Sequence, residues 1–162
     1  MTLSRPARRT ALTATVLVAG AASALAVLPA ASADQPLRLT SVAAPDRNTD
    51  LDLGEPGPSA GDTQVFLDDL QRDGRTVGTS AGSCTVTTLS ETRLVAVCTT
   101  TLTLAEGSLT TQGTFDEDPS VGPTGYTWAV TGGTGRYAEA AGEVVGAFRP
   151  GTDTVDLEVR LQ

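Results

Sequence analysis

A glycine-rich stretch, TGGTGRYAEAAGEVVG at residues 131–146, has the composition of a loop that could cradle a phosphate group. A P-loop needs a lysine that reaches the phosphates, but all basic residues of this chain are arginines. A dinucleotide-binding loop opens a helix, whereas the residues after this stretch return to a strand pattern. We therefore interpret Gly132, Gly133 and Gly135 as a structural turn, followed by a short bridge that covers one end of the fold.

The absence of histidine restricts the remaining chemistry. Ser-His-Asp and Cys-His mechanisms are excluded within this chain, and so is a zinc site built from histidine. The acidic run at residues 50–55 lacks the spacing of an EF-hand calcium loop, so we interpret it as a solvated loop. The sequence predicts no metal site and no cofactor, and any catalysis must use carboxylates, arginine, tyrosine or backbone groups.

Two cysteines, Cys84 and Cys98, are the only thiol-bearing residues of the chain. They lie at equal distances from residue 91, so a hairpin that turns there would place them opposite each other. CxxC spacing is absent, which disfavours a redox pair or a pair of metal ligands. We predict a structural disulfide, as expected for an exported chain.

The first 33 residues have the pattern of a cleaved secretory signal peptide. Three arginines precede an apolar core at residues 10–30, and an A-x-A site ends at Ala33. A transmembrane anchor is the alternative, but no basic stop-transfer cluster follows the apolar core. The Arg8-Arg9 pair permits twin-arginine export, although the general secretion route fits better. We predict a mature chain that begins at Asp34 and is secreted into the extracellular space.

The charge of the chain narrows its expected partners. The formal net charge is −8, from 19 acidic and 11 basic residues, and every acid follows the expected cleavage site. Nucleic acids and anionic membranes require clustered lysine or arginine, so neither is an expected partner of the mature chain. The use of arginine without lysine is typical of a GC-rich genome and favours a bacterial source.

After a Pro/Gly-rich loop, the chain has the pattern of strands joined by short turns. The clearest strand is DTVDLEVRL at residues 153–161, in which apolar and charged residues alternate. Seven or eight such segments predict an all-β fold, and their internal glycines favour a single antiparallel β-barrel of about eight strands over a sandwich. We expect an N-terminal strand with a flexible acidic Pro/Gly loop at 34–60 and the barrel at 61–162. The few aromatic residues either fill the barrel core or line an internal pocket.

Four segments resemble, in the same order, motifs of the dirigent and allene oxide cyclase-like barrel proteins. GDTQVFLDDL resembles their early V-F-x-D-x-L strand, and GRTVGTSAGSC resembles their G-x-x-V-G-x-x-x-G-x-C segment. GSLTTQGTF resembles their G-x-[IL]-T-x-Q-G strand, and AVTGGTGRYAEAAGEV resembles T-G-G-T-G-x-[FY]-x-G-A-R-G. The resemblance covers residues 61–148, and by it the chain is identified as a bacterial member of this family.

The resemblance implies an eight-stranded antiparallel barrel around an apolar cavity, and a homo-oligomer such as a dimer or the trimer of plant members. Plant dirigent proteins steer radical coupling or cyclisation of phenolic quinone methides, and allene oxide cyclases fold and close an oxidised fatty-acid chain. Both act chiefly by holding a reactive molecule in one conformation. A small apolar or phenolic ligand is therefore the expected partner.

The matching positions give candidate site residues. Asp68 occupies the aspartate of V-F-x-D-x-L and is the candidate catalytic acid or base, with a structural strand-end aspartate as the alternative. Strand alternation should turn its neighbour Asp69 outward. The arginine of G-A-R-G falls on Ala141, a departure that weakens any claim of dirigent chemistry. The candidate ligand-binding residues are Phe66, Tyr126, Trp128, Arg136 and Tyr137.

Three functions remain open at this point. The barrel could bind a small apolar or phenolic molecule without catalysis, or it could be a cofactor-free cyclase or isomerase that steers ring closure or radical coupling. It could instead be a non-catalytic extracellular surface module with a packed barrel. Binding without catalysis requires an internal cavity with no perturbed titratable group, catalysis requires a cavity with a buried carboxylate, and a surface module requires a filled interior.

Overall fold

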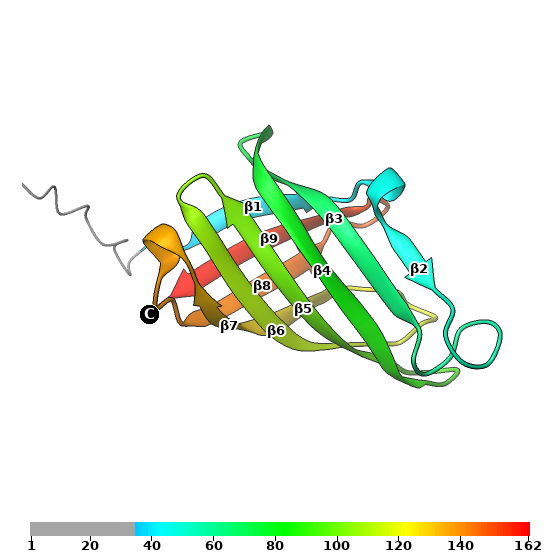
Figure 1. Cartoon of the computed structure of the whole chain (residues 1–162). Coiled ribbons are helices and arrows are strands. Elements are labelled where there is room, and N and C mark those ends of the chain that lie inside the picture. Colours follow the sequence, from blue (N-terminus) through cyan, green and yellow to red (C-terminus); the bar gives the residue numbers. More distant parts are fainter. Residues whose placement is uncertain (1–34) are drawn as a thin grey trace, which may run out of the picture.

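The computed structural model describes residues 35–162, so the expected signal peptide at residues 1–33 lies outside the described residues. Short turns join most of the strands, and two 3-10 helices interrupt the series (Figure 1). In chain order the elements are β1 (Leu37–Val42), η1 (Pro45–Arg47), β2 (Thr49–Leu51), β3 (Thr63–Arg72), β4 (Arg75–Leu89), β5 (Leu94–Leu104), β6 (Gly107–Glu117), β7 (Gly125–Gly133), η2 (Gly135–Tyr137), β8 (Gly142–Phe148) and β9 (Thr154–Leu161). Within this described part, no helix has the length and apolar character needed to cross a membrane.

Eight of the strands form a closed antiparallel barrel. Hydrogen-bonded neighbours follow the order β1-β9-β8-β7-β6-β5-β4-β3, and β1 also pairs with β3, which closes the ring. β2 lies outside the ring, against the N-terminal half of β3. The predicted all-β fold with a single antiparallel barrel of about eight strands is therefore confirmed. The barrel includes β1, which the sequence analysis placed ahead of it, because β1 supplies the pairing that joins β9 to β3.

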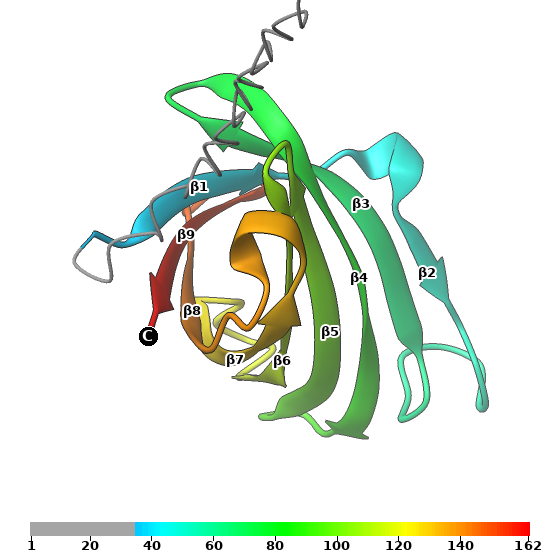
Figure 2. The same ribbon diagram turned by 60° about the vertical axis from the view of Figure 1, so that its left-hand side comes forward.

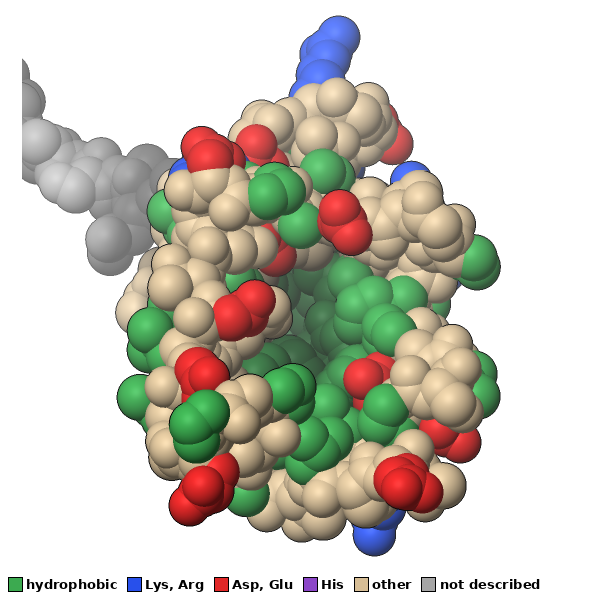
Figure 3. Space-filling model, turned by 90° about the vertical axis from the view of Figure 1, so that its right-hand side faces the viewer, with side chains coloured by type: hydrophobic (Ala, Val, Ile, Leu, Met, Phe, Trp, Pro, Cys, Tyr) green, Lys and Arg blue, Asp and Glu red, His purple; other side chains and the backbone are tan. Residues whose placement is uncertain are grey.

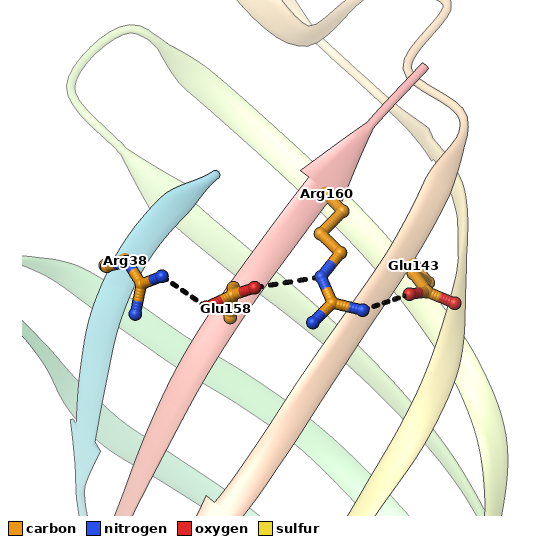
Figure 4. A network of polar contacts seen from close by, with 4 residues as sticks. All are labelled: Arg38, Glu143, Glu158 and Arg160. Atoms are coloured by element: carbon orange, nitrogen blue, oxygen red, sulfur yellow. Dashed lines mark hydrogen bonds and ion pairs between the residues drawn. The ribbon is translucent and has the colours of Figure 1, made fainter. Parts of the chain in front are cut away.

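Strand alternation separates the inside of the barrel from the outside. On β9, Leu157 and Val159 are buried, whereas Glu158 and Arg160 form ion pairs on the outer surface. Figure 4 shows these pairs as a chain of contacts across three strands, from Arg38 through Glu158 and Arg160 to Glu143, with N···O distances of 2.7 to 2.9 Å. Exposed pairs of this kind each contribute less than about 1 kcal/mol, so the chain of contacts mainly fixes the positions of these arginines outside the barrel.

The η2 turn closes one end of the barrel, as Figure 2 shows for the orange segment. The backbone N–H of Arg136 donates to the carbonyl of Glu106 at 2.8 Å, and Thr134 N–H donates to Ser108 at the same distance. Gly135 has a φ of +60°, and a side chain there would collide with the Glu106 backbone. Tyr137 from this turn is buried in the core. The turn is thus held against the β5–β6 hairpin and seals this end.

The disulfide predicted from the cysteine spacing is confirmed. Cys84 and Cys98 are directly paired residues of β4 and β5, with a Cα–Cα distance of 4.1 Å, and their sulfurs are bonded. The bond therefore links the two strands in the middle of their hairpin.

Candidate functional site

An internal cavity of about 960 Å³ opens at the end of the barrel opposite η2. Figure 3 looks into this mouth and shows an apolar hollow with acidic side chains around its rim. All eight barrel strands contribute inward-facing residues to the lining, and the segment at 43–58, which includes η1 and β2, contributes part of the rim. The volume is at the upper end of the range of small-molecule sites. The described residues therefore enclose an open cavity, whereas the surface-module hypothesis requires a filled interior.

Stacked aromatic rings form one wall of this cavity. Tyr126 and Trp128 lie nearly parallel, with centroids 3.9 Å apart and an interplanar angle of 20°. Phe148 contacts Tyr126 edge-on at 6.0 Å, and Phe115 contacts Phe148 at 5.7 Å. The Trp128 Nε1–H donates to the Thr114 carbonyl at 2.9 Å, so the polar atom of the indole is already satisfied by the barrel wall. These rings therefore offer a ligand their apolar surfaces.

Inward-facing glycines explain why the aromatic rings line the cavity and leave it open. A Cβ at Gly113 would overlap the Trp128 side chain, and a Cβ at Gly146 would overlap the Tyr126 ring. Each ring therefore lies flat over a strand position that lacks a side chain. Phe66, Tyr126 and Trp128 all border the cavity, and Trp128 is at the same time part of the buried core.

Asp68 lies in the cavity wall where β1 and β3 separate. Its carboxylate accepts a hydrogen bond from Asn48 Nδ2 at 3.1 Å and a longer one from Ser41 Oγ at 3.4 Å. The neighbouring Asp69 points outward and pairs with Arg47 at 2.7 Å, as strand alternation predicts. Asp68 therefore has two neutral donors and remains open to the cavity.

Tyr126 lies across the cavity from Asp68. Three strands separate β3 from β7 in either direction around the ring, so the two residues stand on opposite walls. Burial, together with the negative charge of Asp68, raises the pKa of Tyr126 to about 12. The phenol is therefore a neutral hydrogen-bond donor throughout the physiological range, facing a carboxylate.

This pairing gives a titration test. In a Tyr137→Phe background, tyrosinate absorbance of the folded protein is expected to rise near pH 12, compared with about pH 10 for an exposed tyrosine. Adding Asp68→Asn should lower the pKa of Tyr126, because it removes one of the two causes of the shift. Since the unfolded chain loses this proton first, the free energy of unfolding should fall as the pH rises above about 10. A folded-state tyrosine that titrates near pH 10 would contradict the buried position of the phenol.

Two cavity-lining polar groups were missed by the sequence analysis. Glu117 lies at the end of β6, and burial raises the pKa of its carboxyl. Within residues 35–162, neither Glu117 Oε2 nor the Oγ1 of Thr100 has a hydrogen-bond partner, although both atoms are buried. Strand alternation could have predicted that both side chains face inward. Glu117 is two residues from the inward-facing Phe115, and Thr100 is two residues from the inward-facing Cys98. The resemblance directed attention to Asp68 instead.

Arg136 and Tyr137, two of the predicted ligand contacts, do not line the cavity. Arg136 is exposed on η2, and Tyr137 is buried at the closed end of the barrel. The η2 turn carries both residues to the end opposite the mouth, so their contact with a ligand stays a prediction that the cavity does not support. Ala141, at the position of the family arginine, is also outside the lining, and its carbonyl accepts the backbone N–H of Gln162.

A family model for the allene oxide cyclase barrel like domain matches residues 40–159. Several solved structures are similar to the chain. A pyocyanin demethylase is 28% identical with a TM-score of 0.65, and the match covers 78% of this chain and 99% of that one. An exo-specific intermolecular Diels-Alderase is 18% identical with a TM-score of 0.59, covering 78% of this chain and 96% of that one. A pterocarpan synthase dirigent protein is 22% identical with a TM-score of 0.54, and the match covers 76% of this chain and 91% of that one. No curated protein matches the chain.

Proposed function

The chain belongs to the allene oxide cyclase barrel like domain family, and on that premise we propose that it is a secreted barrel that holds a small apolar or phenolic molecule in its internal cavity. The observation that carries this proposal is the open cavity with its stacked Tyr126 and Trp128 wall. An aromatic ligand can pack against the ring atoms that remain open to the cavity, while the few polar groups opposite them fix its orientation.

The similar structures support a small-molecule function. The pyocyanin demethylase, the most similar of the three in sequence, is named for action on a small molecule, and so are the Diels-Alderase and the pterocarpan synthase dirigent protein. The latter two are too distant to support more than the shared fold. Their differing activities on one barrel agree with a site whose specificity comes from the lining residues.

A cofactor-free isomerase or cyclase activity is the second candidate, and the Asp68–Tyr126 arrangement favours it. The Asp68 carboxylate would accept a proton from the bound molecule, and the neutral Tyr126 hydroxyl would donate a hydrogen bond to an oxygen that becomes negative. Returning the proton from Asp68 to another atom of the substrate would complete an isomerisation or ring closure. The cavity walls would contribute by holding the reacting atoms together.

Native mass spectrometry of the mature protein, before and after incubation with neutral phenols, tests binding. A co-purified or captured molecule is expected, whereas a bare chain with every probe would overturn the binding proposal. Asp68→Asn then separates catalysis from binding. If Asp68 is the acid or base, turnover of an identified substrate should fall by about 10²-fold or more with binding retained. Asp69→Asn, which removes the adjacent outward carboxylate, should leave both unchanged. Equal turnover in wild type and Asp68→Asn would exclude the catalytic role.

Mass spectrometry of the product released when the full chain is expressed tests the proposed export. Cleavage after Ala33 would leave a chain that begins at Asp34, with a mass lower by two hydrogens because of the disulfide. An oligomer, as the resemblance implies, stays a prediction that the mass of the native assembly would test.

A further inference from the structure

The charged residues that line the cavity are all acidic. Asp68 and Glu117 lie in its walls, and four further carboxylates lie around its mouth: Asp50, Asp52, Asp62 and Asp153. No arginine within residues 35–162 contributes to the lining. Figure 3 shows the same distribution as acidic side chains around the rim of an apolar hollow. A ligand that enters therefore meets negative charge on an apolar background.

The arginines near the mouth are held by carboxylates outside the cavity. Arg47 pairs with Asp69 at 2.7 Å, and Arg93 pairs with Asp116 at 2.6 Å. Each of these outward aspartates is adjacent in sequence to an inward carboxylate, Asp68 in one case and Glu117 in the other. On both β3 and β6, strand alternation thus places one carboxylate outside the barrel, where it pairs with an arginine. The adjacent carboxylate faces the cavity and has no arginine partner among the described residues.

Two buried polar atoms in the cavity lining have no hydrogen-bond partner among the described residues. They are Glu117 Oε2 and the Oγ1 of Thr100, whose residue is only 7% exposed. A buried carboxylate oxygen without a donor is costly, so such groups are normally paired. A bound molecule that carries N–H donors or a positive charge would provide the missing partner for Glu117. Thr100 pairs with Thr111, six residues before Glu117 on β6, so its hydroxyl lies about 20 Å deeper along the strand and is not part of the same contact.

We propose that the cavity selects a flat aromatic ligand that carries a positive charge, such as an aromatic ammonium or a nitrogen-heterocyclic cation, and that it disfavours aromatic or fatty carboxylates. This inference rests on the proposed binding function and narrows its ligand class. The cation would pair with Glu117, whose Oε2 has no hydrogen-bond partner among the described residues, and the aromatic wall of Tyr126 and Trp128 would attract the same charge. An anion would meet the carboxylates of the cavity with no arginine in the described lining to offset them.

Three probes with one ring system and different charges test the proposal: 1-naphthylmethylammonium, 1-naphthalenemethanol and 1-naphthylacetate. Isothermal titration calorimetry of the mature protein at neutral pH and low salt should give the cation roughly tenfold tighter binding than the neutral alcohol, with the anion weakest. Equal affinity for the three probes, or tighter binding of the anion, would overturn the charge selectivity while leaving the binding function intact. If none of the three binds, the proposed function fails together with this inference.

A matched pair of variants locates the selectivity. Glu117→Gln should weaken binding of the cationic probe roughly tenfold and change binding of the neutral alcohol less than about twofold. Glu106→Gln removes the same charge from an exposed position at the closed end, outside the lining, and should change the binding of neither probe. If both variants weaken the cation equally, the selectivity comes from the net charge of the protein, and the assignment to the cavity is wrong. The comparison of probes on the wild-type protein remains a test even if a variant fails to fold.

Discussion

Replacing Cys84 and Cys98 together with alanine is expected to lower the free energy of unfolding by about 3 kcal/mol. The disulfide closes a loop between residues that are 14 apart in sequence, and the open chain of the variant gains the corresponding entropy in its unfolded state. The effect is large for a domain of this size, whose total stability is expected to be on the order of 5–15 kcal/mol. Urea denaturation of the oxidised wild type and of the double variant measures it directly.

Reduced wild-type protein is the control for this prediction. Cys98 is fully buried, so alanine also removes packing around a sulfur, whereas reduction keeps both sulfur atoms in place. Most of the loss should already be present in the reduced wild type. An unchanged urea midpoint after reduction would show that pairing of β4 with β5 holds the hairpin without help from the covalent bond.

Properties set within one strand or one hairpin could be predicted from the sequence. The alternation on β9 and the pairing of Cys84 with Cys98 depend on residues close together in the chain, and both predictions are confirmed. The position of Asp69 outside the barrel follows from the same alternation. The order of the strands depends on longer-range pairing and was not predicted, since the family resemblance implied only a closed eight-stranded antiparallel barrel.

Arg136 and Tyr137 lie outside the cavity for a reason that local sequence does not reveal. The glycine-rich motif was correctly read as a turn, but its direction depends on hydrogen bonds to Glu106 and Ser108, about 28 residues earlier in the chain. Those bonds carry the turn over the closed end. Nothing in the motif itself states which end of the barrel is open.

The family resemblance implied an apolar cavity, but the residues themselves left open whether the aromatic side chains fill the interior or line it. Glycines within strands were read as marks of bends, which is one of their common roles. Their further role appears only with the strand register, which places Gly146 directly opposite Tyr126. Whether an aromatic residue fills a barrel or lines it thus depends on which residue faces it on the next strand.

Gly146→Ala is expected to cost about 1–3 kcal/mol of stability and to reduce ligand binding at least about tenfold. The added methyl group would overlap the Tyr126 ring, so the ring must move away from the wall. The direction left open to it is the cavity, where it would lose the stacked contact with Trp128 and occupy the space of the ligand. Urea denaturation and calorimetry with 1-naphthalenemethanol, a neutral probe, measure the two effects without interference from charge.

A double-mutant cycle with Tyr126→Ala shows whether this collision is the cause. In the absence of the ring, the methyl group at residue 146 meets no aromatic neighbour, so Gly146→Ala should then cost much less than in the wild type. The coupling between the two substitutions should be on the order of 1 kcal/mol or more. Strictly additive losses would mean that the methyl group and the ring do not compete for space. In that case the inward glycines would not be what keeps the rings against the wall, and the open cavity would need another physical cause.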